Sequence, residues 1–119
     1  MEGQSVKPET LVVLWSSGDR EVATKMGFMY TLNAKLRGWW KNVTLIVWGP
    51  SAKLLTEDSE LQDLIKEMRA TGVVLLACKA CSDIYGVSET LEKFGVEVKY
   101  TGELFTQILK DSAQRVITP

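Results

Sequence analysis

The sequence contains no histidine, and this absence excludes more chemistry than any other feature of its composition. Hydrolases of the Ser-His-Asp and Cys-His types need an imidazole as general base, and most catalytic zinc sites need it as a ligand. Any catalysis by this chain therefore depends on thiols, carboxylates, amines, phenols or hydroxyls.

The chain also lacks an excess of charge of either sign, since it contains 14 Lys and Arg residues and 15 Asp and Glu residues. A domain that binds nucleic acid normally carries a basic excess on one face. The composition therefore argues against nucleic acid as a partner.

Long hydrophobic runs are missing as well. The apolar stretches have the length of a strand, far below the ~20 residues that cross a bilayer. Residues 1–9 are polar, have no apolar centre of a signal peptide, and are expected to form a flexible segment. We therefore expect a cytoplasmic protein that does not insert into membranes, with residues 1–119 forming a single domain.

Apolar runs of strand length alternate with segments of helical pattern along the whole chain. Strands are predicted at residues 11–15, 43–48, 73–77, 96–100 and 115–118, the last two at sheet edges. Helices are predicted at residues 19–36, 52–55, 58–70 and 104–109, with a further one after Cys81 that resumes at Ser88 as its cap. Continuous apolar strands separated by helices are typical of a parallel sheet covered on both faces. The sequence therefore predicts an α/β fold: one three-layer, doubly wound domain of about five mostly parallel strands.

Three segments follow predicted strands directly and form the candidate site: residues 16–19, 49–51 and 78–82. In parallel α/β sheets, ligands bind outside the carboxyl ends of the strands, near helix N-termini. The first two segments offer backbone N–H groups and hydroxyls to an anion or small ligand, and a role in capping the next helix competes with that reading. Their candidate ligand-binding residues are Ser16, Ser17, Gly18, Gly49 and Ser51.

The two cysteines form a Cys-x-x-Cys pair in the third segment, with Cys78 at the strand end and Cys81 near the first helical turn. In a reducing compartment such a pair indicates redox, metal or catalytic chemistry rather than a structural disulfide. Free backbone N–H groups and the helix dipole favour the thiolate there, and Lys79 adds a nearby cation. Cys78 and Cys81 are therefore the candidate catalytic residues.

Three other interpretations of the pair stay open. Both thiols could pack as small apolar side chains, because cysteine is among the most buried residue types. Structural zinc needs four ligands, of which two cysteines supply half, so a zinc site would need a subunit interface. A thioredoxin-type dithiol has the same spacing, but this pair follows the third strand and no proline-containing loop is evident to face it. No cofactor and no resident metal are expected from these residues.

The segment Gly72-Val73-Val74-Leu75-Leu76-Ala77-Cys78, followed by Gly86-Val87, resembles the DsrE/TusD-like (DsrE/DsrF/YchN-like) family of sulfur-relay proteins. In that family a glycine and a short apolar strand lead to a cysteine, and a helix then runs to a Gly-Val pair at the same offset. The resemblance implies a small parallel α/β sheet and a homo-oligomer, either trimer or hexamer. It also implies that Cys78 carries sulfur as a persulfide, while Cys81 has no counterpart in the simplest family pattern.

Two functions of different classes follow from these observations. The first is a sulfur carrier or sulfurtransferase, in which Cys78 takes sulfane sulfur from a donor protein as a persulfide and an acceptor thiol removes it. Cys81 would then either attack that persulfide, which forms a disulfide and releases sulfide, or tune its neighbour. The second is a non-catalytic oligomeric binding module with an anion or small-ligand cleft at the strand ends. The sequence alone leaves open whether the protein is an enzyme.

Overall fold

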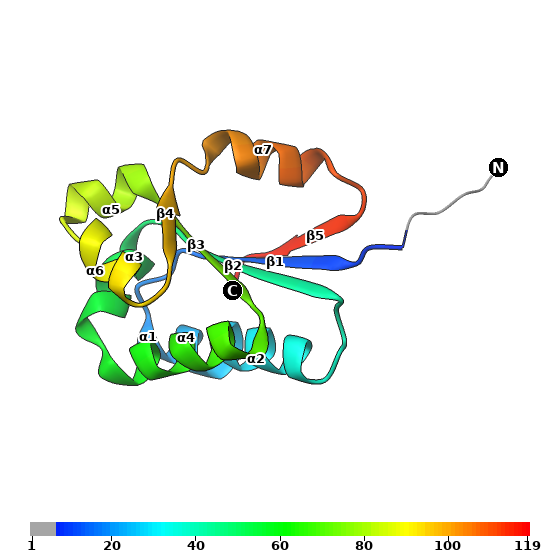
Figure 1. The fold of residues 1–119 in the computed structure, drawn as a ribbon, viewed down its shortest axis with the longest axis horizontal. Helices are drawn as coiled ribbons and strands as arrows, with labels where there is room; N and C mark the ends of the chain where they lie inside the picture. The colour runs from blue at the N-terminus through cyan, green and yellow to red at the C-terminus, as the bar shows by residue number, and fades with distance from the viewer. Residues whose placement is uncertain (1–6) are drawn as a thin grey trace.

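Five parallel strands form the sheet at the centre of the computed structural model, which describes residues 7–119 (Figure 1). The strands are β1 (Thr10–Trp15), β2 (Asn42–Val47), β3 (Val74–Cys78), β4 (Glu97–Lys99) and β5 (Gln114–Ile117). Their order across the sheet is β4-β3-β2-β1-β5, and every neighbouring pair is parallel. The predicted α/β fold is therefore confirmed, with β4 and β5 at the two edges as expected.

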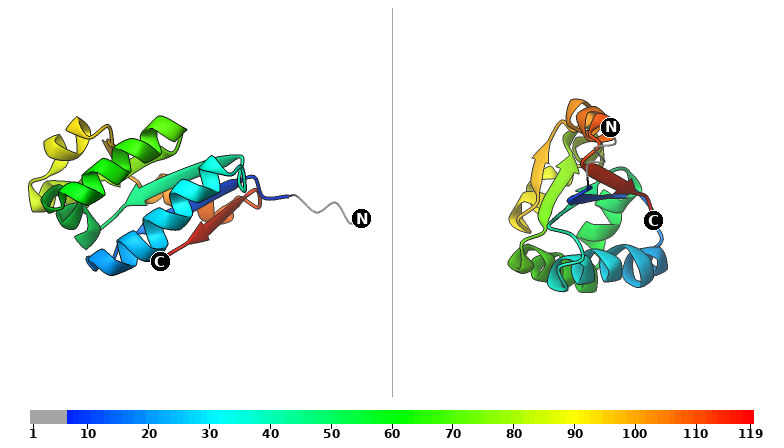
Figure 2. Two further views of the ribbon diagram at one scale, coloured as in Figure 1. Left: turned by 90° about the horizontal axis from the view of Figure 1, so that it is seen from below. Right: turned by 90° about the vertical axis from the view of Figure 1, so that its right-hand side faces the viewer.

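Helices cover both faces of this sheet, but unevenly. The helical segments are α1 (Arg20–Val22), the π-helix η1 (Ala23–Gly27), α2 (Phe28–Leu36), α3 (Pro50–Glu57), α4 (Ser59–Thr71), α5 (Lys79–Tyr85), α6 (Ser88–Lys93) and α7 (Gly102–Lys110). Helix α7 lies alone on one face, whereas α2 and α4 lie side by side on the other (Figures 1 and 2). Helices α5 and α6 lie at the end of the sheet where the strands finish (Figure 1).

The apolar core is divided by the sheet into two parts. Leu11, Val13 and Trp15 of β1 face the larger part, which α2, α4 and α6 cover. Val12, between them in the sequence, faces the smaller part together with Ile108 of α7. Because both faces of the strand are buried, its sequence is a continuous apolar run rather than an alternating one.

The segment predicted as one helix at residues 19–36 is helical throughout, but it contains the π turn η1. Asp19 begins it by accepting hydrogen bonds from the backbone N–H groups of Glu21 and Val22, at 2.8 and 3.3 Å. Met26 and Met29, whose spacing helps to indicate the helix, lie on its outer face and are 48% and 54% exposed. The helix therefore buries smaller residues and one phenylalanine against the sheet: Ala23, Gly27, Phe28, Thr31 and Ala34.

Two local expectations need correction or limitation. Ser88 was expected to cap α6, but the cap position is Val87 and the Ser88 hydroxyl instead donates to Asp83 at 2.6 Å. The prediction is wrong because the carboxylate of Asp83, near the end of α5, lies close enough to accept a hydrogen bond from the Ser88 hydroxyl.

Of the segment expected to be flexible, residues 1–6 lie outside the described residues. Glu9 is hydrogen bonded to the backbone of both β2 and the turn before β5.

None of the helices within residues 7–119 is long and apolar enough to span a membrane.

Candidate functional site

The candidate site lies at the edge of the sheet where the strands end. Strands β1 to β4 are neighbours and run in the same direction, so the segments that follow them meet along this edge. These segments are residues 16–19, 48–51, 78–81 and 100–101. The structure thereby brings together the three segments expected from the sequence and adds a fourth, after β4.

Cys78 is the last residue of β3 and the residue that precedes α5. Its side chain is 6% exposed. Side chains alternate along a strand, so Cys78 shares a face with Leu76, which packs in the small core under α7. Its partner on β4 is Lys99, and the chain passes from there directly into Thr101 and α7. The thiol is therefore enclosed between the end of β3 and the start of α7.

Hydrogen-bond donors around the Cys78 sulfur favour its thiolate. Burial raises the pKa of this thiol, but the backbone N–H of Cys81, the hydroxyl of Thr101 and the thiol of Cys81 lower it. The backbone N–H of Ala80 acts in the same direction, and the net result is a pKa below that of an ordinary cysteine. Since the thiolate is the nucleophilic form, this environment increases the reactive fraction at neutral pH.

Thr101 is a functional candidate that sequence reasoning missed. It is 1% exposed, and its hydroxyl makes no conventional hydrogen bond within residues 7–119. A buried hydroxyl without a partner costs about 1–3 kcal/mol, so such groups are rare in folded proteins. The hydroxyl lowers the pKa of Cys78, so it favours the charged form of that sulfur. The signal that could have found it is its place after the fourth strand, at the same sheet edge.

Cys81 is half-buried and has an environment of its own. Burial and the hydrogen bond with Cys78 raise its pKa, while the backbone N–H of Gly49 and the indole N–H of Trp48 oppose this rise. The net direction is upward, so Cys81 stays protonated where Cys78 is ionised. The pKa values of the two thiols thus shift in opposite directions, and different donors act on the two sulfurs.

The two loops expected to bind a ligand touch each other. A Cβ at Gly18 would lie 3.3 Å from the Cβ of Pro50, and one at Gly49 would lie 4.0 Å from the backbone oxygen of Ser16. Gly49 has φ +82°, a conformation that favours glycine. Through its N–H, this residue also connects the second loop to Cys81.

Two of the three candidate serines in these loops, Ser17 and Ser51, use their hydroxyls in internal hydrogen bonds. Ser17 Oγ accepts from the backbone N–H of Asp19 at 3.0 Å. Ser51 is fully buried, and its hydroxyl donates to the backbone oxygen of Trp15 at 2.5 Å. Ser51 therefore holds the ends of β1 and β2 together, and a ligand at either serine stays a prediction.

Lys79, expected as a cation beside the thiol, pairs with a carboxylate instead. Its ammonium lies 2.8 Å from Asp83, one turn further along α5, and 5.9 Å from the centre of the Tyr100 ring. Its charge is therefore largely balanced at the surface. Among residues 7–119, no group of three or more Cys, His, Asp or Glu side chains gathers into a metal-binding cluster.

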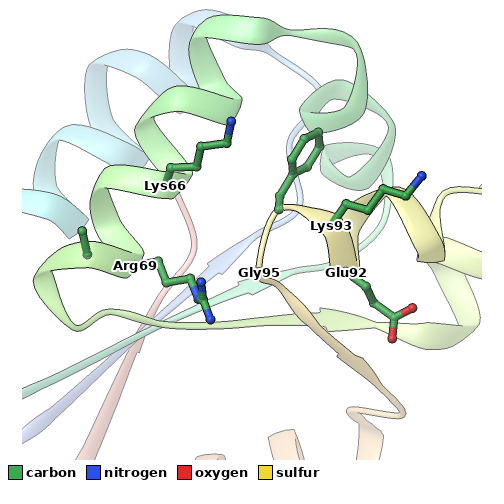
Figure 3. A pocket seen from close by; sticks show the side chains of 7 residues that line it. Lys66, Arg69, Glu92, Lys93 and Gly95 are labelled. Atoms are coloured by element: carbon green, nitrogen blue, oxygen red, sulfur yellow. The ribbon is translucent and has the colours of Figure 1, made fainter.

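A surface pocket of about 660 Å³ lies elsewhere, between α4 and the turn that joins α6 to β4 (Figure 3). Lys66, Arg69 and Lys93 give it a basic lining, and Gly95 leaves room for Arg69, since a Cβ there would lie 2.6 Å from its Cδ. The pocket contains neither cysteine and lies at the beginning of β4, whereas Cys78 pairs with the end of that strand. Its charged side chains are all exposed, so the thiols stay the candidate site.

The family of the chain follows from a match over nearly its full length. A family model described as the DsrE/DsrF-like family matches residues 10–119. The chain belongs to the DsrE/DsrF-like family. This confirms the resemblance seen in the glycine, strand and cysteine pattern around Cys78.

Solved structures share the fold of this DsrE/DsrF-like protein. A conserved protein of unknown function from Bacteroides thetaiotaomicron, BT1422, is 34% identical, with a TM-score of 0.89 over 93% of this chain and 95% of its own. The YchN protein from E. coli is 16% identical, with a TM-score of 0.71 over 94% and 99% of the two chains. MTH1491 from Methanobacterium thermoautotrophicum, also of unknown function, is 19% identical, with a TM-score of 0.71 over 95% and 100%. No curated protein sequence matches the chain.

Proposed function

We propose that this protein is a sulfur carrier that binds sulfane sulfur as a persulfide on Cys78 and passes it to an acceptor thiol. The observation that carries the proposal is the environment of that thiol: a buried strand-end cysteine whose pKa is lowered by the N–H of Cys81 and by the buried hydroxyl of Thr101. Membership of the DsrE/DsrF-like family supports it, because the resemblance implies sulfur relay through this position.

The loading step is a displacement at sulfur. The Cys78 thiolate attacks the terminal sulfur of a donor persulfide, R–S–SH, and forms the Cys78 Sγ–S bond. The donor S–S bond breaks, and the donor leaves as the thiolate RS⁻. In the second step an acceptor thiolate attacks the same terminal sulfur, and Cys78 leaves as thiolate. No net oxidation occurs in either step, so no cofactor is needed.

The groups around Cys78 suit both halves of this exchange. The N–H of Cys81 and the hydroxyl of Thr101 stabilise negative charge on Sγ before loading and again when it becomes the leaving group. A lower pKa makes a thiol a better leaving group in such exchanges. Burial of Cys78 limits access of water and oxidants, so the bound sulfur is kept for partners that fit the site. We include a homo-oligomer, a sulfur donor protein and an acceptor protein in the proposal, as the family resemblance implies.

Mass spectrometry of the reduced protein tests the proposal. Wild type, Cys78→Ser and Cys81→Ser are each incubated with one equivalent of glutathione persulfide, and the cysteine peptide is analysed without reductant. We expect Cys81→Ser to gain one sulfur atom on Cys78, and Cys78→Ser to gain none. If Cys78→Ser loads as much sulfur as Cys81→Ser, Cys78 is not the carrier, and the binding-module alternative with its loops at Ser16–Asp19 and Gly49–Ser51 gains support.

A further inference from the structure

We propose that Cys81 is a resolving thiol, which converts the Cys78 persulfide into a Cys78–Cys81 disulfide and releases sulfide. The protein then acts as a sulfane-sulfur reductase as well as a carrier. This inference rests on the proposed loading of Cys78, and it assigns a second reaction to the same site.

The positions of the two thiols allow the bond to form. Cys78 immediately precedes α5 and Cys81 is its third residue, so their side chains lie on the same face of the first turn. Each thiol also shifts the pKa of the other, as expected of close neighbours. Neighbours of this kind lie within the range of Cα separation that a disulfide accepts, about 4.4–6.8 Å.

Cys81 also has donors that are independent of those at Cys78. The N–H of Gly49 and the indole N–H of Trp48, both from the segment after β2, lower the pKa of its thiol. The ring of Trp48 is held by an edge-on contact with Phe105 of α7, with ring centres 5.5 Å apart. A thiol that served only as packing would need no such donors, whereas a thiol that must ionise for attack does.

Loading of Cys78 favours this ionisation. The hydrogen bond and the charge of the Cys78 thiolate help to raise the pKa of Cys81 before loading. Once Cys78 carries sulfur, any negative charge lies mainly on the terminal sulfur atom, one bond further from its neighbour. The thiolate of Cys81 therefore forms more readily after loading than before it, which gives the two steps their order.

The reaction balances in atoms and electrons. The Cys81 thiol loses its proton to solvent, and its thiolate attacks Sγ of Cys78. The bond from Sγ to the terminal sulfur breaks, and that sulfur leaves as HS⁻. The two cysteines are oxidised together by two electrons, which reduce the sulfane sulfur to sulfide. An external dithiol then reduces the disulfide and completes the cycle.

The difference in burial determines where that dithiol attacks. Cys78 is buried and Cys81 is half-buried, so the sulfur of Cys81 is the accessible one. Attack there releases Cys78, the thiol with the lower pKa and hence the better leaving group. Reduction thus returns the site to the state in which Cys78 is ready to accept sulfur.

The experiment follows sulfide and protein mass after one equivalent of glutathione persulfide is added to reduced wild type, Cys81→Ser and Cys81→Ala. We expect wild type to release close to one equivalent of sulfide and to lose two hydrogens as the disulfide forms. Both variants should keep the sulfur on Cys78 and release at least tenfold less sulfide. If wild type keeps its persulfide as long as the variants do, the resolving role is overturned while the carrier function stands. If no variant loads sulfur, the carrier function itself fails, and this inference fails with it.

Trp48→Phe separates a chemical role of Cys81 from a structural one. It retains the aromatic contact with Phe105 and removes the N–H that lowers the pKa of Cys81. Loading should be unchanged, while the pH at which sulfide release is half-maximal should move upward. A release profile identical to that of wild type would contradict the assignment of this N–H to the reaction.

Discussion

At the scale of single residues, Thr101 connects stability with reactivity. Thr101→Val keeps the shape of the side chain and removes a buried hydroxyl that has no conventional partner within residues 7–119. Because the hydroxyl lowers the pKa of Cys78, we expect that pKa to rise in the variant. The thiolate fraction, and with it the rate of alkylation, should fall several-fold at pH values below the pKa and match wild type well above it. The rate of alkylation measured between pH 5 and 9 checks this.

Thr101→Ser is the matched control, because it keeps the hydroxyl and loses one methyl group. It should retain the reactivity of wild type, while the valine variant loses it without loss of stability in urea denaturation. Equal alkylation profiles for the valine variant and wild type would show that Thr101 does not face the sulfur.

The residues of the candidate site were predictable to different degrees. Cys78 and Cys81 follow from the sequence, because the rule for strand ends and the Cys-x-x-Cys spacing both lead to them. Thr101 and Trp48 were missed, since their relevance depends on which strands are neighbours of β3. A single sequence contains no information on that pairing, and an aromatic residue at a strand end looks like any core residue.

At the scale of helices, Asp58 joins two elements. Its carboxylate accepts a hydrogen bond from the backbone N–H of Leu61 at 3.1 Å and caps α4, and it also pairs with Arg20 of α1. The Leu61 N–H, followed by the Arg20 side chain, lowers the pKa of this carboxyl. We expect Asp58→Ala to lower the free energy of unfolding by about 1–2 kcal/mol at pH 7, the usual cost of losing such a cap.

The stabilisation by Asp58 decreases as the pH falls. Since the folded-state pKa of Asp58 lies below its unfolded value, its stabilising contribution is present above about pH 4 and is lost as the pH falls through the folded-state pKa. Urea denaturation at pH 7 and pH 3 should show wild type and Asp58→Ala converging at the lower pH. Asp58→Asn, which keeps an oxygen for the cap, should lose about half as much stability at pH 7. A loss for Asp58→Ala that is the same at both pH values would contradict this account.

For the helix at residues 19–36, the sequence predicts the ends of the element but not the irregular turn inside it. Its existence and its ends follow from the cap at Asp19 and the stop near Gly38, which has φ +67°. The π turn η1 does not follow, because one extra residue per turn leaves no local signature. That turn rotates the face of the helix, so small residues meet the sheet and the methionines face outward.

At the scale of the whole molecule, the outer face of η1 and α2 is the strongest candidate for self-association. Met26, Met29 and Leu36 on this face, and Trp39 just after α2, are about half exposed, which is unusual for neighbouring large apolar side chains. Together with the homo-oligomer implied by the family resemblance, this predicts that a second copy binds this face. Met29→Glu should shift the protein toward monomer in sedimentation velocity while circular dichroism stays unchanged.

Gln107→Glu, on the exposed side of α7, adds the same charge outside this face and should leave the oligomer intact. An oligomer that survives Met29→Glu would move the interface elsewhere. The exposed Ile84 and Tyr85 of α5 would then be the next candidates.

The architecture as a whole was more predictable than its details. Continuous apolar strands alternating with helices specify a parallel sheet covered on both faces, because only that arrangement buries both sides of each strand. The order of the strands was not predictable in full. The last strand could have joined either edge, and the structure places it beside β1.

This placement of β5 has a consequence for synthesis on the ribosome. Strand β1 emerges early, but its second partner is translated about a hundred residues later, which takes roughly 5–20 s at ordinary elongation rates. During that time one side of β1 presents unpaired N–H and C=O groups, the kind of open edge that recruits other chains. The open edge of β1 in the nascent protein is thus a binding site for a holdase chaperone. This exposure ends when β5 leaves the exit tunnel and pairs with β1.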